Sequence, residues 1–196
     1  RLLSDSILQT ENMDAQTVRE FVGDIEQESE RLARITENLL RLTRLDSGML
    51  PEAQRVDLSS VMARVVRMLR LVAEEKQVDL AYEIRREGQT LASEDEIHEI
   101  IYNLTENAIK YNRPGGFVRV TLGGTEDECV LRVEDNGIGI PEEDRPRVFD
   151  RFYRVDKMRS RAAGGTGLGL SIAADTARRR GGSIEVRARE GGGTVF

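Results

Sequence analysis

The chain has 196 residues, enough for one large domain or two small ones. Its 39% hydrophobic and 33% charged residues are typical of a globular protein with a strongly hydrated surface. The net charge of −6 argues against general nucleic-acid binding. No apolar run approaches the ~18 residues that a membrane-spanning helix needs, and no signal-peptide pattern opens the sequence.

Residues 1–50 carry a heptad pattern. Its apolar positions form two seams three residues apart: Val18, Ile25, Leu32 and Leu39, and then Phe21, Ile35, Leu42 and Met49. This stripe predicts a long helix that needs a partner helix. Because residues 1–8 look like the end of a preceding helix, we expect a helical hairpin, two copies of which would form a dimeric four-helix bundle. The alternative is that the helix packs on the second region of its own chain.

After Gly48 and Pro51, which end the helix, the pattern becomes mixed α/β. The predicted domains are a helical hairpin over 1–50, a linker over 51–56 and a second domain over 57–196. Periodicity predicts helices over 58–76, 94–112 and 168–180, strands over 78–84, 117–122, 129–134 and 183–189, and a last strand near residue 196. The predicted class is α+β, with a mixed sheet that helices cover on one face.

Cys129 is the only cysteine and lies in a predicted strand. A single cysteine cannot form an internal disulfide bond, and its neighbours alternate between apolar and polar residues. We therefore expect a reduced, intracellular core residue rather than a reactive thiol.

Four short segments carry chemical information, and the asparagine segment (residues 103–112) is the first. Asn103, Asn107, Lys110 and Tyr111 are spaced i, i+4, i+7 and i+8, which places them on one helical stripe. Amide oxygens suit Mg²⁺, which takes its other ligands from water and substrate phosphates. Lys110 can offset phosphate charge. The alternative is an ordinary solvated helix face.

The second is the aspartate–glycine turn (residues 135–139), at the end of a predicted strand. Asp135 can accept a hydrogen bond from an amine such as the exocyclic group of adenine. Gly137 and Gly139 permit positive φ and a close approach to a flat ligand. Hairpin turns and calcium loops can carry the same pattern.

The glycine segment (residues 164–170) alternates Gly165, Gly167 and Gly169 at the start of an apolar helix. A helix N-terminus exposes unpaired N–H groups and the positive end of the helix dipole, so it favours phosphate. The segment lacks the lysine of a P-loop, and it also lacks the preceding strand and the downstream acid of a dinucleotide-binding fold.

The phenylalanine segment (residues 149–154) begins a polar stretch that leads to those glycines. Such long loops are often lids. Phe149 and Phe152 are predicted to anchor this one, and Arg154 or Lys157 could reach phosphates. A disordered surface loop is the alternative.

Taken in chain order, the asparagine segment, the aspartate–glycine turn, the phenylalanine segment and the glycine segment resemble the N, G1, F and G2 boxes of sensor histidine kinases. These kinases belong to the GHKL superfamily shared with Hsp90, gyrase B and MutL. With the heptad hairpin, the resemblance covers nearly the whole chain. It implies a Bergerat-type α/β sandwich after a dimeric bundle, with ATP and Mg²⁺ as ligands. The implied reaction transfers the γ-phosphoryl group of ATP to a histidine, and then to an aspartate in the receiver domain of a response regulator. It also implies a cytoplasmic location, with no nucleic-acid partner and with membrane contact only through segments outside this chain.

The resemblance further implies the roles of individual residues. Asn107 would be the Mg²⁺ ligand, Asp135 would bind adenine, and Asn107, Lys110 and Arg154 would act in catalysis. The residues implied to bind the nucleotide are Asn103, Asn107, Lys110, Tyr111, Asp135, Gly137, Gly139, Phe152, Lys157, Gly165, Thr166, Gly167, Leu168 and Gly169.

The chain departs from this family in one respect. The His-Glu-x-x-Thr-Pro type box that carries the phosphoacceptor is absent, and the sole histidine, His98, lies off the asparagine stripe. Because the sequence also starts without methionine, we expect a piece of a longer protein that cannot phosphorylate itself. Two other interpretations are a nucleotide-binding dimeric regulatory module without kinase activity and a GHKL-type ATPase. The intact nucleotide residues argue against the first, and the heptad hairpin argues against the second.

Overall fold

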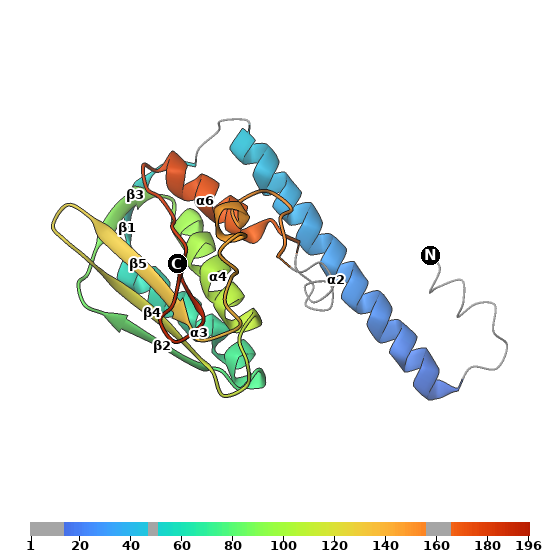
Figure 1. Cartoon of the computed structure of the whole chain (residues 1–196). Helices are drawn as coiled ribbons and strands as arrows, with labels where there is room; N and C mark the ends of the chain where they lie inside the picture. Colours follow the sequence, from blue (N-terminus) through green and yellow to red (C-terminus); the bar gives the residue numbers. More distant parts are fainter. Residues whose placement is uncertain (1–13, 47–50, 156–165) are drawn as a thin grey trace. The chain divides into compact units, whose positions relative to one another are not determined.

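The computed structural model of the chain describes residues 14–46, 51–155 and 166–196, and it divides into two compact units, Arg1–Thr43 and Arg44–Phe196. Helix α2 (Ala15–Asp46) is the predicted heptad helix (Figure 1). Two apolar side chains of the heptad, Leu32 and Leu39, are exposed on it, with 56% and 44% of their surface accessible. The preceding helix predicted for residues 1–8 and the heptad position Met49 lie outside the described residues. None of the described helices combines the length and the apolar character needed to cross a bilayer.

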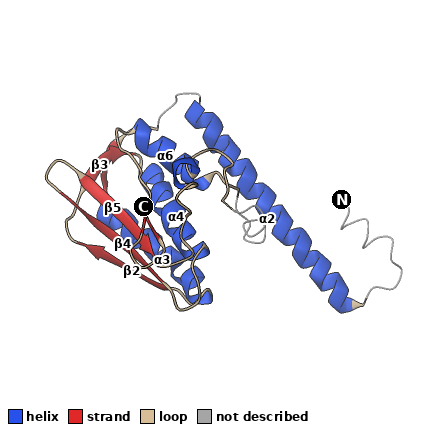
Figure 2. Cartoon of the chain, in the orientation of Figure 1, coloured by secondary structure: helices blue, strands red, loops and turns tan. Residues whose placement is uncertain are grey.

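The second unit contains a five-stranded mixed sheet with helices on one face, as predicted (Figure 2). Its strands, in spatial order, are β2 (Asp79–Ile84), β4 (Phe117–Gly124), β5 (Cys129–Asp135), β7 (Thr194–Val195) and β6 (Arg187–Ala188). Strands β2 and β4 are parallel and the other neighbouring pairs are antiparallel. The covering helices are α3 (Leu58–Glu75), α4 (Glu94–Lys110) and α6 (Gly169–Arg179).

The core lies between this sheet and its helices. Alternate residues of β4, namely Val118, Val120 and Leu122, are completely buried and face the helices. Helices α3 and α4 bury their apolar stripes on the same side, with Met62 and Ile109 among the fully buried side chains. Apolar residues that repeat every two positions in the strands and every 3.6 positions in the helices therefore face the same interface. This is why their spacing in the sequence predicted these elements.

Local hydrogen bonds fix where the helices begin. Asp57 caps α3, because its carboxylate accepts the N–H of Ser59 at 3.0 Å. Ser93 and Glu96 form a reciprocal capping box at the start of α4: the Ser93 N–H donates to Glu96 at 2.7 Å, and the Glu96 N–H donates to Ser93 at 3.2 Å. Each cap satisfies N–H groups that have no partner within the helix.

Two short strands lie where none was predicted. Strand β1 (Gln54–Asp57) occupies part of the segment assigned to a linker, and it pairs antiparallel with β3 (Gln89–Ala92) in a separate two-stranded sheet. The last three residues of the predicted linker, 54–56, are thus part of a strand. The predicted strand 183–189 shrinks to β6, because its partner β7 is only two residues long. A single-turn 3₁₀ helix, η1 (Arg145–Arg147), follows the aspartate–glycine turn.

The prediction for Cys129 was also wrong, because the residue is exposed. It lies at the outer end of the β4–β5 hairpin, paired with Gly124. Burial along its face of β5 increases from exposed Cys129 through half-buried Leu131 to fully buried Val133. The alternation identified the face correctly but could not show that the strand extends past the buried part of the sheet.

The loop before β7 offers a matched test of backbone strain. Gly192 and Gly193 both have positive φ, +97° and +105°, but only at Gly193 would an added Cβ overlap the backbone of Asp135. Replacing Gly193 with alanine should therefore destabilise the unit by more than about 3 kcal/mol, while the same change at Gly192 should cost only about 1–3 kcal/mol of strain. Denaturant unfolding of the two variants measures the difference. Equal stabilities would contradict the close approach of this loop to Asp135.

Candidate functional site

Helix α4 supplies the polar stripe of the site. The Asn103 amide donates to the Glu99 carbonyl one turn earlier, at 3.0 Å, which fixes the orientation of its side chain. Its oxygen then faces the start of α6, where a Cβ on Gly169 would lie 2.6 Å from it. Asn103 therefore packs α4 against α6 at the glycine segment, and Gly169 leaves room for that contact.

One turn further along α4 lies Asn107, which is half-buried. Within the described part of the chain, its side-chain amide has no hydrogen-bond partner, whereas its main-chain carbonyl accepts the N–H of Tyr111 at 3.0 Å. Lys110 places its ammonium group 5.6 Å from the centre of the Tyr111 ring. The stripe predicted from the sequence thus contains an amide available to a ligand beside a positive charge.

Asp135 ends strand β5 in a buried position, with 5% of its surface exposed. Its carboxylate accepts the Gly137 N–H at 2.8 Å, and also the N–H and the hydroxyl of Thr194 on β7. Burial raises the pKa of Asp135 above its usual value, although these hydrogen bonds and the charge of Arg189 act in the opposite direction. A buried carboxylate held from two sides in this way is a fixed hydrogen-bond acceptor.

The aspartate–glycine turn packs directly on the end of α4. The Ile138 N–H donates to the Tyr111 carbonyl at 3.1 Å, and a Cβ on Gly137 would lie 2.5 Å from the same carbonyl oxygen. Positive φ, predicted for both glycines, occurs at Gly139 (+73°), while Gly137 is required by this close approach. The first two segments are therefore joined through their backbones.

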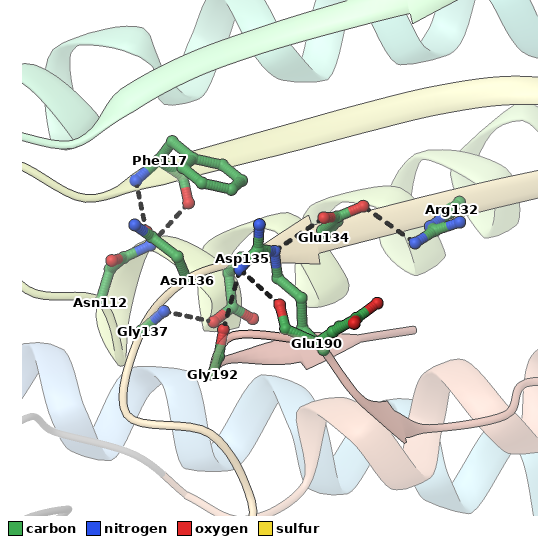
Figure 3. Close-up of polar contacts among 10 residues, drawn as sticks. Asn112, Phe117, Arg132, Glu134, Asp135, Asn136, Gly137, Glu190 and Gly192 are labelled. Carbon is green, nitrogen blue, oxygen red and sulfur yellow. Dashed lines mark hydrogen bonds and ion pairs between the residues drawn. The ribbon is translucent and has the colours of Figure 1, made fainter.

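Two asparagines that the sequence analysis assigned no role brace this junction (Figure 3). Asn136 accepts the Phe117 N–H at 2.6 Å, and Asn112 donates to the Phe117 carbonyl at 2.9 Å. Together they tie both segments to the first residue of β4. Asn136 precedes Gly137 and Asn112 precedes Arg113 in the sequence, and only their partners in space reveal this role.

The phenylalanine and glycine segments also touch each other. The Phe152 N–H donates to the Gly167 carbonyl at 2.9 Å, and Phe152 and Gly167 both have positive φ, +63° and +72°. Phe149 packs edge-on against Phe196, with ring centres 6.4 Å apart. Phe152 is 60% exposed, so the prediction that it anchors the segment was wrong, because its left-handed backbone turns the side chain outward.

Arg154 follows on the same segment. Burial raises the pKa of Tyr111, and the positive charge of Arg154 opposes that shift. The predicted phosphate contacts Lys157 and Gly165 lie outside the described residues.

Helix α6 begins at Gly169, directly after buried Leu168. No side chain caps it in the described part of the chain, although the Leu168 N–H donates to the Thr166 hydroxyl at 3.3 Å. Its first N–H groups and the positive end of its dipole therefore remain available to an anion. Since Gly169 packs on Asn103, this helix start adjoins the polar stripe of α4.

His98 lies on α4, stacked on Tyr102 with ring centres 6.0 Å apart. Among the described residues, no group of three or more His, Cys, Asp or Glu side chains could hold a metal ion. The side-chain oxygen of Asn107, together with water and a bound phosphate, would form a donor set of the kind that Mg²⁺ accepts.

Known proteins with similar sequences and structures point to one family. Residues 92–196 match the family model described as "Histidine kinase-, DNA gyrase B-, and HSP90-like ATPase". The sensor-like histidine kinase SenX3 of Mycolicibacterium smegmatis is 36% identical over 196 residues, which are 100% of this chain and 51% of that protein. The sensor histidine kinase WalK of Bacillus subtilis is 36% identical over 185 residues, which are 90% of this chain and 29% of that protein.

Solved structures agree. The mycobacterial sensor histidine kinase MprB superposes with a TM-score of 0.63 at 27% identity, covering 73% of this chain and 93% of that one. The chain spans about half the length of SenX3 and under a third of WalK. The chain belongs to the family of histidine kinase-, DNA gyrase B- and HSP90-like ATPases, and its second unit is a catalytic domain of the sensor histidine kinase type.

Proposed function

We propose that this chain binds Mg·ATP and transfers its γ-phosphoryl group to a histidine, from which a response-regulator aspartate receives it. The main support is that the asparagine segment contacts the aspartate–glycine turn through Tyr111 and the start of α6 through Asn103. A fixed acid, an oxygen ligand and an uncapped helix N-terminus are what adenine, a divalent cation and a phosphate chain require. The SenX3 and WalK relatives are named as histidine kinases, which supports the same reaction.

Each group has a distinct task in this proposal. The Asp135 carboxylate accepts a hydrogen bond from the exocyclic amine of adenine. The amide oxygen of Asn107 would be a ligand of Mg²⁺, and the ion would supply charge stabilisation when bound. Lys110, Arg154 and the N–H groups that begin α6 balance the charge on the phosphoryl oxygens. Phosphoryl transfer demands positioning and charge stabilisation from the protein more than covalent chemistry.

The acceptor must come from outside these residues, because His98 is unsuited to the task. It is half-buried and stacked on Tyr102 inside the catalytic domain. We therefore expect no autophosphorylation by this chain alone. Exposed Leu32 and Leu39 on the heptad helix favour a homodimer through α2, since a coiled-coil seam gains stability only when a second helix covers it. The receiver domain of a response regulator is the proposed partner, and the cytoplasm, where ATP is available, is the proposed location.

The test is trans-phosphorylation. The chain, Mg²⁺ and γ-labelled ATP are mixed with a dimerisation domain that carries an acceptor histidine and no nucleotide site. We expect acid-labile, alkali-stable label on the acceptor, no label on this chain, and very slow ATP hydrolysis without the acceptor. Rapid hydrolysis with no labelled acceptor would instead identify an ATPase, and binding without either reaction would identify a regulatory module.

A further inference from the structure

Arg180, the C-cap residue of helix α6, connects that helix to helix α4 and to the segment at Pro51. Its Nε atom lies 3.1 and 2.9 Å from the two carboxylate oxygens of Glu96, and its Nη2 atom lies 2.7 Å from Oε2 of the same residue. Nη2 also donates to the Pro51 carbonyl at 2.8 Å. The Arg180 and Glu96 side chains are only 13% and 10% exposed, so little water screens this bidentate pair.

Glu96 belongs to the other helix of the site. It closes the capping box of α4, the helix that presents Asn103 and Asn107 further along. Helix α6 runs antiparallel to α4: its start packs on Asn103 through Gly169, and its end is clamped to Glu96 through Arg180. Contacts at both ends of α6 therefore fix how far it can slide along α4, and with it the distance between the uncapped α6 N-terminus and Asn107.

The third contact reaches the chain where it enters the unit. Pro51 is the first described residue after helix α2, and strand β1 begins three residues later. Pro51 is exposed, and among the described residues Arg180 is its only hydrogen-bond partner. The guanidinium that fixes the two site helices therefore also tethers the incoming chain.

We propose that Arg180 is a positioning residue that sets the register of α6 on α4 for Mg·ATP and couples that register to the entering segment at Pro51. This inference rests on the proposed nucleotide site. Only an arginine fits the task, because a planar fork of donors can serve a carboxylate and a carbonyl at once, whereas lysine presents a single point charge.

The test compares Arg180→Gln with Arg179→Gln in the 196-residue chain. Arg179 is the neighbouring arginine at the same helix end. It is exposed, and its side chain has no hydrogen-bond or ion-pair partner in the described part of the chain, so the control removes the same charge without breaking a contact. Mg·ATP affinity is measured by calorimetry well below the unfolding temperature of both variants. Amide hydrogen exchange is measured over residues 52–57. We expect about tenfold or more weaker binding and faster exchange in Arg180→Gln only, since small misplacements of positioning groups have large effects.

A second variant keeps the proposal testable if Arg180→Gln does not fold. Glu96→Gln retains an oxygen that can complete the capping box with Ser93, but it weakens the pair with Arg180. Its affinity and its exchange rate should fall between those of the wild type and Arg180→Gln. Affinity equal to that of Arg179→Gln in both variants would overturn the positioning role, and unchanged exchange at 52–57 would overturn the tether. Absence of Mg·ATP binding by the wild type would overturn the proposed function itself, and this inference with it.

Discussion

Replacing Asp135 with asparagine should abolish nucleotide binding and leave the domain at least as stable as the wild type. The variant presents an N–H group where the ligand amine needs an acceptor. The lost hydrogen bond to a charged group alone costs about 1.5–3 kcal/mol, which is about 10- to 150-fold in affinity for ATP, and the opposed N–H groups add to that loss. Calorimetric titration with Mg·ATP measures the loss.

The stability of the same variant follows from the pKa of Asp135, which burial raises. A carboxyl group with a raised pKa in the folded state contributes stability below its unfolded pKa and loses it as the pH rises through the folded value. At neutral pH the buried charge is therefore a cost that asparagine removes. Unfolding at pH 7 should show an equal or higher free energy, with less dependence on pH between acid and neutral conditions.

Glu134 provides the matched control. It directly precedes Asp135 on β5, and its side chain points to the opposite face of the sheet (Figure 3). It pairs with Arg189 at 2.8 Å and with Arg132 at 2.9 Å. Glu134→Gln removes the same charge and should keep the affinity for ATP. Equal losses in both variants would indicate a general charge effect and contradict the assignment of Asp135.

The second large effect is expected at Asn107. Alanine at this position removes the proposed oxygen ligand and suits the helix, so α4 should remain intact. Nucleotide affinity in Mg²⁺ should fall to the value measured with a chelator. Transfer to an acceptor histidine should slow by about a hundredfold or more, because a divalent cation contributes several kcal/mol to such reactions, and each ~1.36 kcal/mol is tenfold in rate.

A substitution at Asn103 distinguishes a packing role from a ligand-binding role on the same helical stripe. Its amide is already engaged with the Glu99 carbonyl, and its oxygen faces Gly169. Asn103→Ala should therefore lower stability and affinity moderately but preserve the dependence of binding on Mg²⁺. Loss of that dependence in Asn103→Ala, with retention in Asn107→Ala, would reverse the two roles.

The sequence predicted the elements that build the site, because their signals are local. The stripe of α4 and the alternation that ends at Asp135 both follow from residue spacing along the chain. Strand β1 was missed because its four residues contain one apolar side chain, Val56, and it pairs only with another short strand. Periodicity cannot reveal strands that depend on a distant partner.

Other features depended on contacts between residues far apart in the chain. Thr194 contacts Asp135 only because β7 returns beside β5, and Arg180 meets Glu96 across 84 positions. The exposure of Phe152 was predicted wrongly because the residue has a positive φ. The sequence gives no reason to expect a bulky residue in that backbone conformation. Residue type and spacing indicated the chemistry of the site, while the contacts that hold its residues in position could be identified only from the three-dimensional structure.

We propose that the asparagine stripe, the aspartate–glycine turn and the start of α6 form one Mg·ATP site. The most direct measurement is a calorimetric titration of the chain with ATP, with and without Mg²⁺, alongside Asp135→Asn. We predict saturable binding of one nucleotide per chain that Mg²⁺ strengthens and that Asp135→Asn abolishes. Absence of binding in the wild type, or the same affinity in Asp135→Asn, would contradict it.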